Sequence, residues 1–133
     1  MKKLICLICP AGCIMEAGGE AEEFSVTGNL CPRGAVYAQE EIRSPKRIVT
    51  ATAAIEGGGA KGKDCGAGFI RRVPVRTTVP CPREKIPALL RDIYKLKVSL
   101  PVSTGDVLIA GWNGAKGMDC GADIDVIATR RIG

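Results

Sequence analysis

The feature that most restricts the fold of this chain is a set of cysteines near its N-terminus, in a sequence with seven cysteines and no histidine. The four are Cys6, Cys9, Cys13 and Cys31, in the spacing C-x2-C-x3-C-x17-C. A two-residue spacer lets the thiolates of successive cysteines converge on one metal, and Gly12 allows close backbone approach beside the third. The lack of histidine excludes His-containing zinc sites and histidine-based acid–base catalysis. We therefore expect a metal site made of these four thiolates.

The spacing also bears on which metal the four thiolates hold. Three ligands close together and one distant is an arrangement that iron–sulfur clusters use, whereas structural zinc ribbons more often have two separated C-x2-C pairs. A [4Fe–4S] cluster is therefore the expected cofactor, with Zn²⁺ as the alternative and metal-free redox cysteines as a third reading. Arg33 follows the fourth cysteine, and its charge would tune the cluster's reduction potential. An ordinary surface arginine at a helix start is the competing interpretation.

A nine-residue segment occurs twice, at 59–67 and at 114–122, with eight identical positions. Both copies fall where we expect the tips of β-hairpins. One interpretation is that the two copies meet to form a second metal site or a disulfide, and the other is an insertion of the kind that glycine-rich loop tips tolerate. The residues of such a second site would be Cys65 and Cys120, with Asp64 and Asp119.

The order of predicted elements favours an α+β fold. We expect a short cysteine-rich metal-binding lobe over residues 1–45, followed over 46–133 by a mostly antiparallel β body with two short helices and two glycine-rich hairpin loops, in one compact unit. A first helix is expected from Cys31-Pro32 to Arg43, and the apolar stripe of residues 86–94 predicts a second. Strands are expected at 47–56, 69–79, 97–100, 106–111 and 124–132. Cys81, between two prolines, is expected to pack as a small apolar residue.

The distribution of charge limits the class of partner. The net charge is +5, with −2 on residues 1–31 and +7 on the rest. Lysines and arginines are scattered, which favours a solvated surface or an acidic protein partner over nucleic acid. The longest uncharged run, residues 4–15, is 12 residues long, whereas a bilayer span needs about 20. With an odd number of cysteines, we expect a soluble, cytoplasmic protein.

Residues 6–13 and 28–34 resemble the N-terminal iron–sulfur segment of the molybdopterin oxidoreductases. That segment presents C-x2-C-x3-C and then a fourth cysteine within G-x-x-C-x-[KR]-G, all bound to [4Fe–4S], and Arg33 stands at its basic position. The resemblance covers roughly the first 50 residues of the 133. The chain is too short to hold the molybdenum domains.

A second resemblance runs along the whole chain. It is carried by 6–10 (CLICP), 26–29 (VTGN), 33–34 (RG), 37–38 (YA), 45–47 (PKR), 74–77 (PVRT), 105–107 (GDV) and 126–130 (VIATR). These segments resemble an uncharacterised family of small four-cysteine proteins of anaerobic bacteria and archaea, described as a domain of unknown function. Its members look like neighbours of an FAD-dependent glycerol-3-phosphate dehydrogenase and an NADH-oxidase-like flavoprotein. The resemblance implies an iron–sulfur or metal-binding accessory subunit of a flavoprotein redox complex.

We therefore expect an electron-transfer subunit that works with an FAD-dependent oxidoreductase subunit, with glycerol 3-phosphate as the candidate substrate of the complex. The chain alone would have no catalytic activity, because four thiolates leave no open coordination position for a substrate. The alternative is a structural zinc module that mediates a protein or nucleic-acid interaction. A thiol–disulfide enzyme using Cys6 and Cys9 is a third possibility, but it would call for a thioredoxin-like βαβ context.

Overall fold

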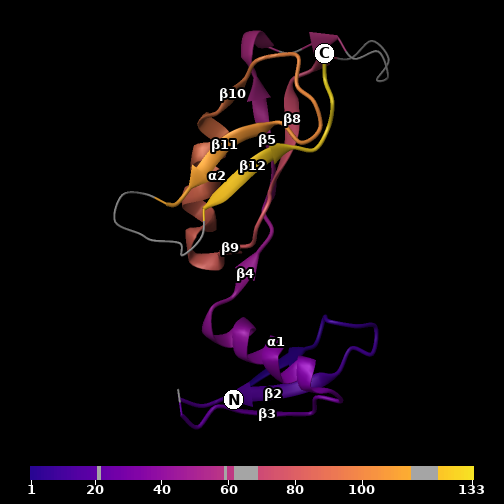
Figure 1. Ribbon diagram of the computed structural model, residues 1–133, viewed down its shortest axis with the longest axis vertical. Coiled ribbons are helices and arrows are strands. Elements are labelled where there is room, and N and C mark those ends of the chain that lie inside the picture. The colour runs from indigo at the N-terminus through magenta and orange to yellow at the C-terminus, as the bar shows by residue number, and fades with distance from the viewer. Residues whose placement is uncertain (21, 59, 62–68, 115–122) are drawn as a thin grey trace. The chain divides into compact units, whose positions relative to one another are not determined.

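The computed structural model describes residues 1–20, 22–58, 60–61, 69–114 and 123–133 (Figure 1). The chain divides into two units, Met1–Pro45 and Lys46–Gly133. Each unit has its own sheet, its own helix and its own group of buried apolar residues.

The N-terminal unit is a three-stranded antiparallel sheet with one helix against it. Its strands are β1 (Lys2–Ile5), β2 (Ile14–Gly18) and β3 (Ser25–Thr27), in the order β1-β2-β3, and its helix is α1 (Pro32–Arg43). Side chains alternate along β2, so that Met15 and Ala17 are buried while Ile14 is exposed. Gly34 of α1 is buried close to Met15, since a Cβ on Gly34 would lie 3.2 Å from the Met15 sulfur. The helix therefore packs closely on the face of the sheet that carries Met15.

The C-terminal unit is built on a five-stranded sheet in the order β10-β5-β8-β12-β11. Its strands are β5 (Thr50–Ile55), β8 (Arg72–Thr77), β10 (Lys97–Val98), β11 (Val107–Trp112) and β12 (Ile124–Ala128). Neighbouring strands are antiparallel except β10, which pairs in parallel with β5. Helix α2 (Ile86–Lys95) covers one face, where Leu89 and Ile93 are fully buried in the core (Figure 1).

Short elements complete the C-terminal unit. The two-residue strands β4 (Lys46–Arg47) and β9 (Cys81–Pro82) pair with each other, as do β6 (Ala60–Lys61) and β7 (Phe69–Ile70). The 3-10 helices η1 (Glu56–Gly58) and η2 (Arg83–Lys85) follow β5 and precede α2.

The prediction of a mainly antiparallel β structure with two helices is confirmed. The expected strand 106–111 appears as β11 with the same length, whereas the other expected strands are shorter than predicted. The expected strand 69–79 is divided into β7 and β8, and the expected strand 97–100 ends at Val98, before the cis peptide bond between Leu100 and Pro101.

The buried Thr77 connects the segment before β5 to the end of β8. Its backbone N–H donates to the carbonyl of Val49 at 3.0 Å, and its Oγ1 accepts from the backbone N–H of Val49 at 3.0 Å. Thr77→Val removes the acceptor and leaves a buried N–H without a partner, so we expect the free energy of unfolding to fall by about 1–3 kcal/mol. Thr77→Ser is the matched control, because it keeps the acceptor and loses only a methyl group. Urea unfolding measures the stability, and hydrogen exchange of the Val49 amide should accelerate in Thr77→Val alone.

Candidate metal centre

Three of the four N-terminal cysteines belong to the loop that joins β1 to β2. Cys6 follows the last residue of β1 and Cys13 precedes the first residue of β2. The backbone N–H of Cys6 donates to the carbonyl of Cys13 at 2.9 Å, which closes the loop at its base. Cys9 lies in the turn between them, where the N–H of Gly12 donates to the Cys9 carbonyl at 3.5 Å. Gly12 has a positive φ of 58° and so adopts the conformation that glycine accommodates without strain.

The β2–β3 pairing brings the fourth cysteine to the same end of the sheet. The last residue of β3, Thr27, is paired with Glu16 of β2. Gly28 then passes very close to β2, because a Cβ on Gly28 would clash with the Ile14 carbonyl oxygen. Cys31 follows as the residue that caps the N-terminus of α1. Since Ile14 directly follows Cys13, all four cysteines lie at the end of the sheet where β1 stops, β2 starts and β3 stops.

The four thiols at this end differ in exposure. Cys6 is 4% exposed and packs with Met15 and Ala17, whereas the other three are half-buried. All four are free thiols. In the part of the chain that the structure describes, no three Cys, Asp or Glu side chains are close enough together to hold a metal ion. The structure therefore places the four cysteines at one end of the sheet without forming them into a ligand set.

Cys31 has the most favourable surroundings for a thiolate. The backbone amide of Gly34 and then the side chain of Arg33 lower the pKa of the Cys31 thiol. Both effects follow from the position of Cys31 at the start of α1, where backbone N–H groups are not used within the helix and an anion is favoured. A lowered pKa favours the form of cysteine that binds metals.

Of the remaining cysteines, the structure describes Cys81. Cys81 is fully buried in the core of the C-terminal unit, with its sulfur 3.5 Å from the Pro82 carbonyl oxygen. Cys65 and Cys120 lie outside the described residues, as does most of the repeated segment.

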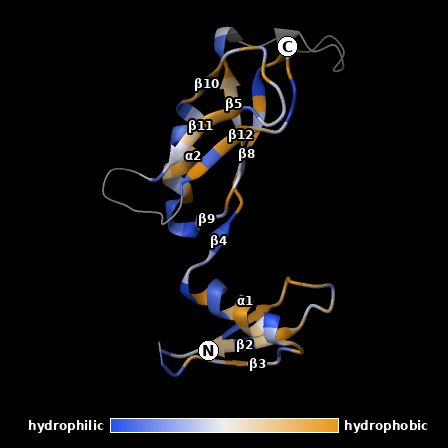
Figure 2. Cartoon of the chain, in the orientation of Figure 1, coloured by the Kyte–Doolittle hydropathy of each residue, from blue (hydrophilic) through white to orange (hydrophobic). Residues whose placement is uncertain are grey.

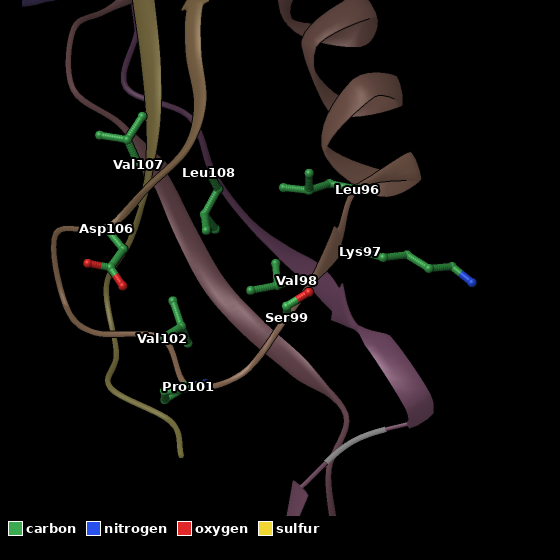
Figure 3. Close-up of a pocket in the computed structure, with 9 residues that line it drawn as sticks. All are labelled: Leu96, Lys97, Val98, Ser99, Pro101, Val102, Asp106, Val107 and Leu108. Carbon is green, nitrogen blue, oxygen red and sulfur yellow. The ribbon is translucent and has the colours of Figure 1, made fainter.

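The C-terminal unit has a pocket of about 410 Å³ that was not predicted from the sequence. It lies between the two edge strands β10 and β11 and is lined mainly by apolar side chains, among them Leu96, Val98, Val102 and Leu108 (Figure 3). Figure 3 shows Lys97 pointing away from the others.

The polar groups at the pocket have partners within the chain. Asp106 Oδ2 accepts from the Ser103 N–H at 2.8 Å, and Ser99 donates to Glu56 Oε2 at 2.6 Å. Both carboxylates therefore accept a hydrogen bond from a neighbouring residue of the same unit.

Comparison with known protein families shows which family the chain belongs to. A family described as proteins of unknown function, DUF1667, matches residues 32–130. The chain belongs to this family. The matched segment of the DUF1667 protein includes α1 and nearly all of the C-terminal unit, and it begins directly after Cys31, so the four N-terminal cysteines precede it. No match was found among curated proteins, and none among solved structures. Within the described residues, no helix is both long and apolar enough to cross a membrane.

The close approach at Gly28 predicts a specific loss of stability. Gly28→Ala would place a methyl group against the Ile14 carbonyl at a φ of +85°. Gly12→Ala is the matched control in the same unit, because its φ is also positive but its new methyl group would have only an ordinary contact, 3.9 Å from the Pro10 oxygen. Both changes cost about 1–2 kcal/mol for the left-handed backbone conformation. Gly28→Ala should destabilise the metal-free chain by at least about 1 kcal/mol more, measured by urea unfolding. Equal effects would show that β2 and residue 28 are not in close contact.

The surroundings of Cys31 predict how its reactivity depends on pH. In the folded, metal-free chain, alkylation of Cys31 by iodoacetamide should reach half its maximal rate at a lower pH than in the urea-unfolded chain, because only the thiolate reacts. Arg33→Gln should move that midpoint upward by removing a positive charge, whereas Arg43→Gln at the other end of α1 should not. Peptide mass spectrometry measures alkylation at Cys31 itself. An unchanged midpoint in Arg33→Gln would rule out the influence of Arg33 on this thiol.

Proposed function

We propose that the chain is an iron–sulfur electron-transfer subunit of a flavoprotein oxidoreductase complex. In this proposal Cys6, Cys9, Cys13 and Cys31 hold one [4Fe–4S] cluster, and Arg33 raises its reduction potential through its positive charge. The chain passes single electrons between the flavin of its partner and a further acceptor.

The observation that carries the proposal is how little the N-terminal unit buries. Its 45 residues have a core of four buried apolar residues, Cys6, Met15, Ala17 and Ala38. Six partly buried apolar residues pack against this core: Leu4, Cys13, Phe24, Val26, Tyr37 and Ile42. Domains below roughly 60 residues are only marginally stabilised by burial, and those near 40 residues usually need a disulfide, a metal or a partner. The unit's cysteines are all free thiols, so no disulfide supplies this stability. Structural Zn²⁺ contributes about 10–16 kcal/mol to the folding of zinc-finger peptides, and a metal centre held by these four thiolates would stabilise the unit in the same way.

The chemistry of the donors fits an iron–sulfur cluster. All four are free thiols at one end of the sheet. The lowered pKa of Cys31 favours the thiolate, which is the form that binds iron. Because the described thiols are not close enough to form a ligand set, binding requires the loop of residues 6–13 to rearrange. The bound cluster supplies a one-electron couple, and the cysteines hold and orient it.

The part played by a flavoprotein rests on the resemblance along the whole chain. This resemblance is to a family described as a domain of unknown function, and the chain's membership of the DUF1667 family supports it. Electron transfer also suits a site with four protein ligands, since such a site leaves no position for substrate. Glycerol 3-phosphate is the candidate substrate of the partner.

Structural zinc is the second candidate function, and the same small core favours it. An all-thiolate site would equally stabilise the N-terminal unit if it held Zn²⁺. The two candidates differ in colour and in redox activity.

Purification without oxygen tests the proposal. We expect a brown protein with about four iron atoms per chain, as a [4Fe–4S] cluster requires, whose visible absorption is bleached by dithionite. Serine in place of Cys6, Cys9, Cys13 or Cys31 should remove most of the colour, whereas Cys81→Ala should keep it. Mixing the reduced protein with oxidised FAD-dependent glycerol-3-phosphate dehydrogenase should restore the colour while the flavin is reduced. A colourless protein with one zinc per chain would establish the second candidate instead.

A further inference from the structure

Cys6 and Cys13 occupy the position that follows the last pair of the β1–β2 ladder. That last pair is Ile5 and Ile14. Just beyond it, the backbone N–H of Cys6 donates to the carbonyl of Cys13 at 2.9 Å, which is the hydrogen bond that an antiparallel ladder makes there. The Cα atoms of residues that face each other in this way lie about 5.5 Å apart, and disulfides span Cα separations of about 4.4–6.8 Å. The strand register therefore holds two cysteines at a spacing that a disulfide bridges.

The side chains of these two cysteines lie on the same face of the sheet. Because side chains alternate along paired strands, the position after Ile5 and Ile14 faces the same side as Met15. Cys6 belongs to the buried core that contains Met15, and Cys13 is partly buried against the same core. Among the described residues that form or contact this core, they are the two cysteines. Burial and register thus agree in directing both thiols to one side.

The surroundings of the pair are apolar. Residues 4–15 contain no charged side chain, and Figure 2 shows the loop between β1 and β2 mainly in the hydrophobic colours. Two neighbouring thiolates without a metal would repel each other here, and burying their charge would be costly. A disulfide carries no charge, so it can lie against this core without that cost.

We propose that Cys6 and Cys13 are a site of oxidative modification. In the metal-free chain they form a disulfide by exchange with a low-molecular-weight disulfide such as oxidised glutathione, and this bond closes the site to metal until it is reduced. The pairing follows from the strand register, whereas its effect on metal loading rests on the proposed function.

The exposure of the two thiols assigns their roles in the exchange. Cys13 is half-buried and Cys6 is only 4% exposed, so Cys13 reaches the oxidant first. Its thiolate attacks one sulfur of oxidised glutathione, which forms a mixed disulfide and releases one glutathione thiolate. The Cys6 thiolate then attacks the Cys13 sulfur, the mixed disulfide breaks, and the second glutathione thiolate leaves. The two cysteines lose two electrons and two protons, and the two glutathione molecules gain them.

The disulfide removes two of the four ligands proposed for the metal. The thiolate is the form of cysteine that binds metals, and neither sulfur of a disulfide is a thiolate. Cys9 and Cys31 alone remain, whereas a [4Fe–4S] cluster or a structural zinc in an all-cysteine site takes four thiolates. A chain that already holds its metal is protected, because both thiolates are then engaged as ligands.

Differential alkylation of the metal-free chain tests the pairing. The chain is stripped of metal, reduced without oxygen and treated with oxidised glutathione, once in buffer and once in urea. Iodoacetamide blocks the thiols that remain free, and reduction followed by N-ethylmaleimide marks those that were in a disulfide. Tandem mass spectrometry locates each label, and the intact mass before reduction reports any bound glutathione.

In buffer we expect N-ethylmaleimide on Cys6 and Cys13, iodoacetamide on Cys9 and Cys31, and no bound glutathione. In urea the shorter loops that include Cys9 should compete, because closing a loop is easier between near neighbours in sequence. The share of the Cys6–Cys13 pair should therefore fall severalfold. A different dominant pair in buffer, or the same distribution of pairs in buffer and urea, overturns the proposal.

Single substitutions test the assigned roles. Cys6→Ser should trap glutathione on Cys13, because the thiol that resolves the mixed disulfide is gone. Cys13→Ser should leave the buried Cys6 largely unmodified. Cys9→Ser is the matched control in the same loop, and it should form the disulfide at the original rate. Loss of the disulfide in Cys9→Ser would contradict the direct pairing of Cys6 with Cys13.

Metal uptake separates this inference from the proposed function. The oxidised and the reduced chain are each incubated with ferrous iron and sulfide, or with Zn²⁺, and the bound metal is measured after desalting. Since metal binding needs deprotonated thiols, the oxidised chain should hold less than about one-tenth of the metal held by the reduced chain. Dithiothreitol should restore the uptake, and equal loading of both forms would show that the disulfide does not close the site.

The two proposals fail in different ways. A chain that joins Cys6 to Cys13 but takes up no iron even when reduced retains this modification site and loses the electron-transfer function. A chain that holds a [4Fe–4S] cluster but whose oxidation joins other cysteines retains the proposed function and loses this modification site.

Discussion

The small amount of apolar surface buried by residues 1–45 is the constraint on which the interpretation of this protein depends. The core of the C-terminal unit contains the branched residues of three adjacent strands and the buried face of α2. The buried core of the N-terminal unit consists of two alanines, a methionine and a cysteine, with six partly buried apolar residues packed against it. Conformational entropy costs about 1–2 kcal/mol for each ordered residue, whether or not the residue lies in a large core. Thiolate–metal bonds are the strongest further interaction that its sequence can supply.

Two close backbone contacts relate the sheet of the N-terminal unit to the position of its cysteines. Gly34 lets α1 approach Met15, and Gly28 lets the chain after β3 pass beside Ile14. A side chain at either position would push the start of α1 away from β2. Because Cys31 is the capping residue of that helix, its distance from the loop of Cys6, Cys9 and Cys13 is set by these glycines. The packing of the small core and the spacing of the thiols are thus consequences of the same contacts.

The parts of the fold that the sequence predicts well are those in which one local pattern decides the outcome. The stripe of apolar residues in α2 and the prolines at the ends of α1 each specify a helix without help from the rest of the chain. Strand lengths are less predictable, because they depend on partners far away in sequence: β8 begins at Arg72, which pairs with Ala54 of β5. Strand β5 continues to Ile55, which pairs with Val98 of β10. The pocket beside Val98 and Leu108 could not be predicted for the same reason, since it lies between the two edges of the sheet. The cysteine spacing predicts a common site, and β-strand register brings the four residues to one end of the sheet, but neither determines the distances between the sulfurs.

The spacing of the cysteines also accounts for the exposure of the residues between them. If the thiols of Cys6 and Cys9 turn towards a common centre, the two residues between them, Leu7 and Ile8, must turn outward. In the structure Cys6 is buried and Cys9 half-buried, while Leu7 and Ile8 between them are exposed, so the observed exposure follows this two-residue spacing.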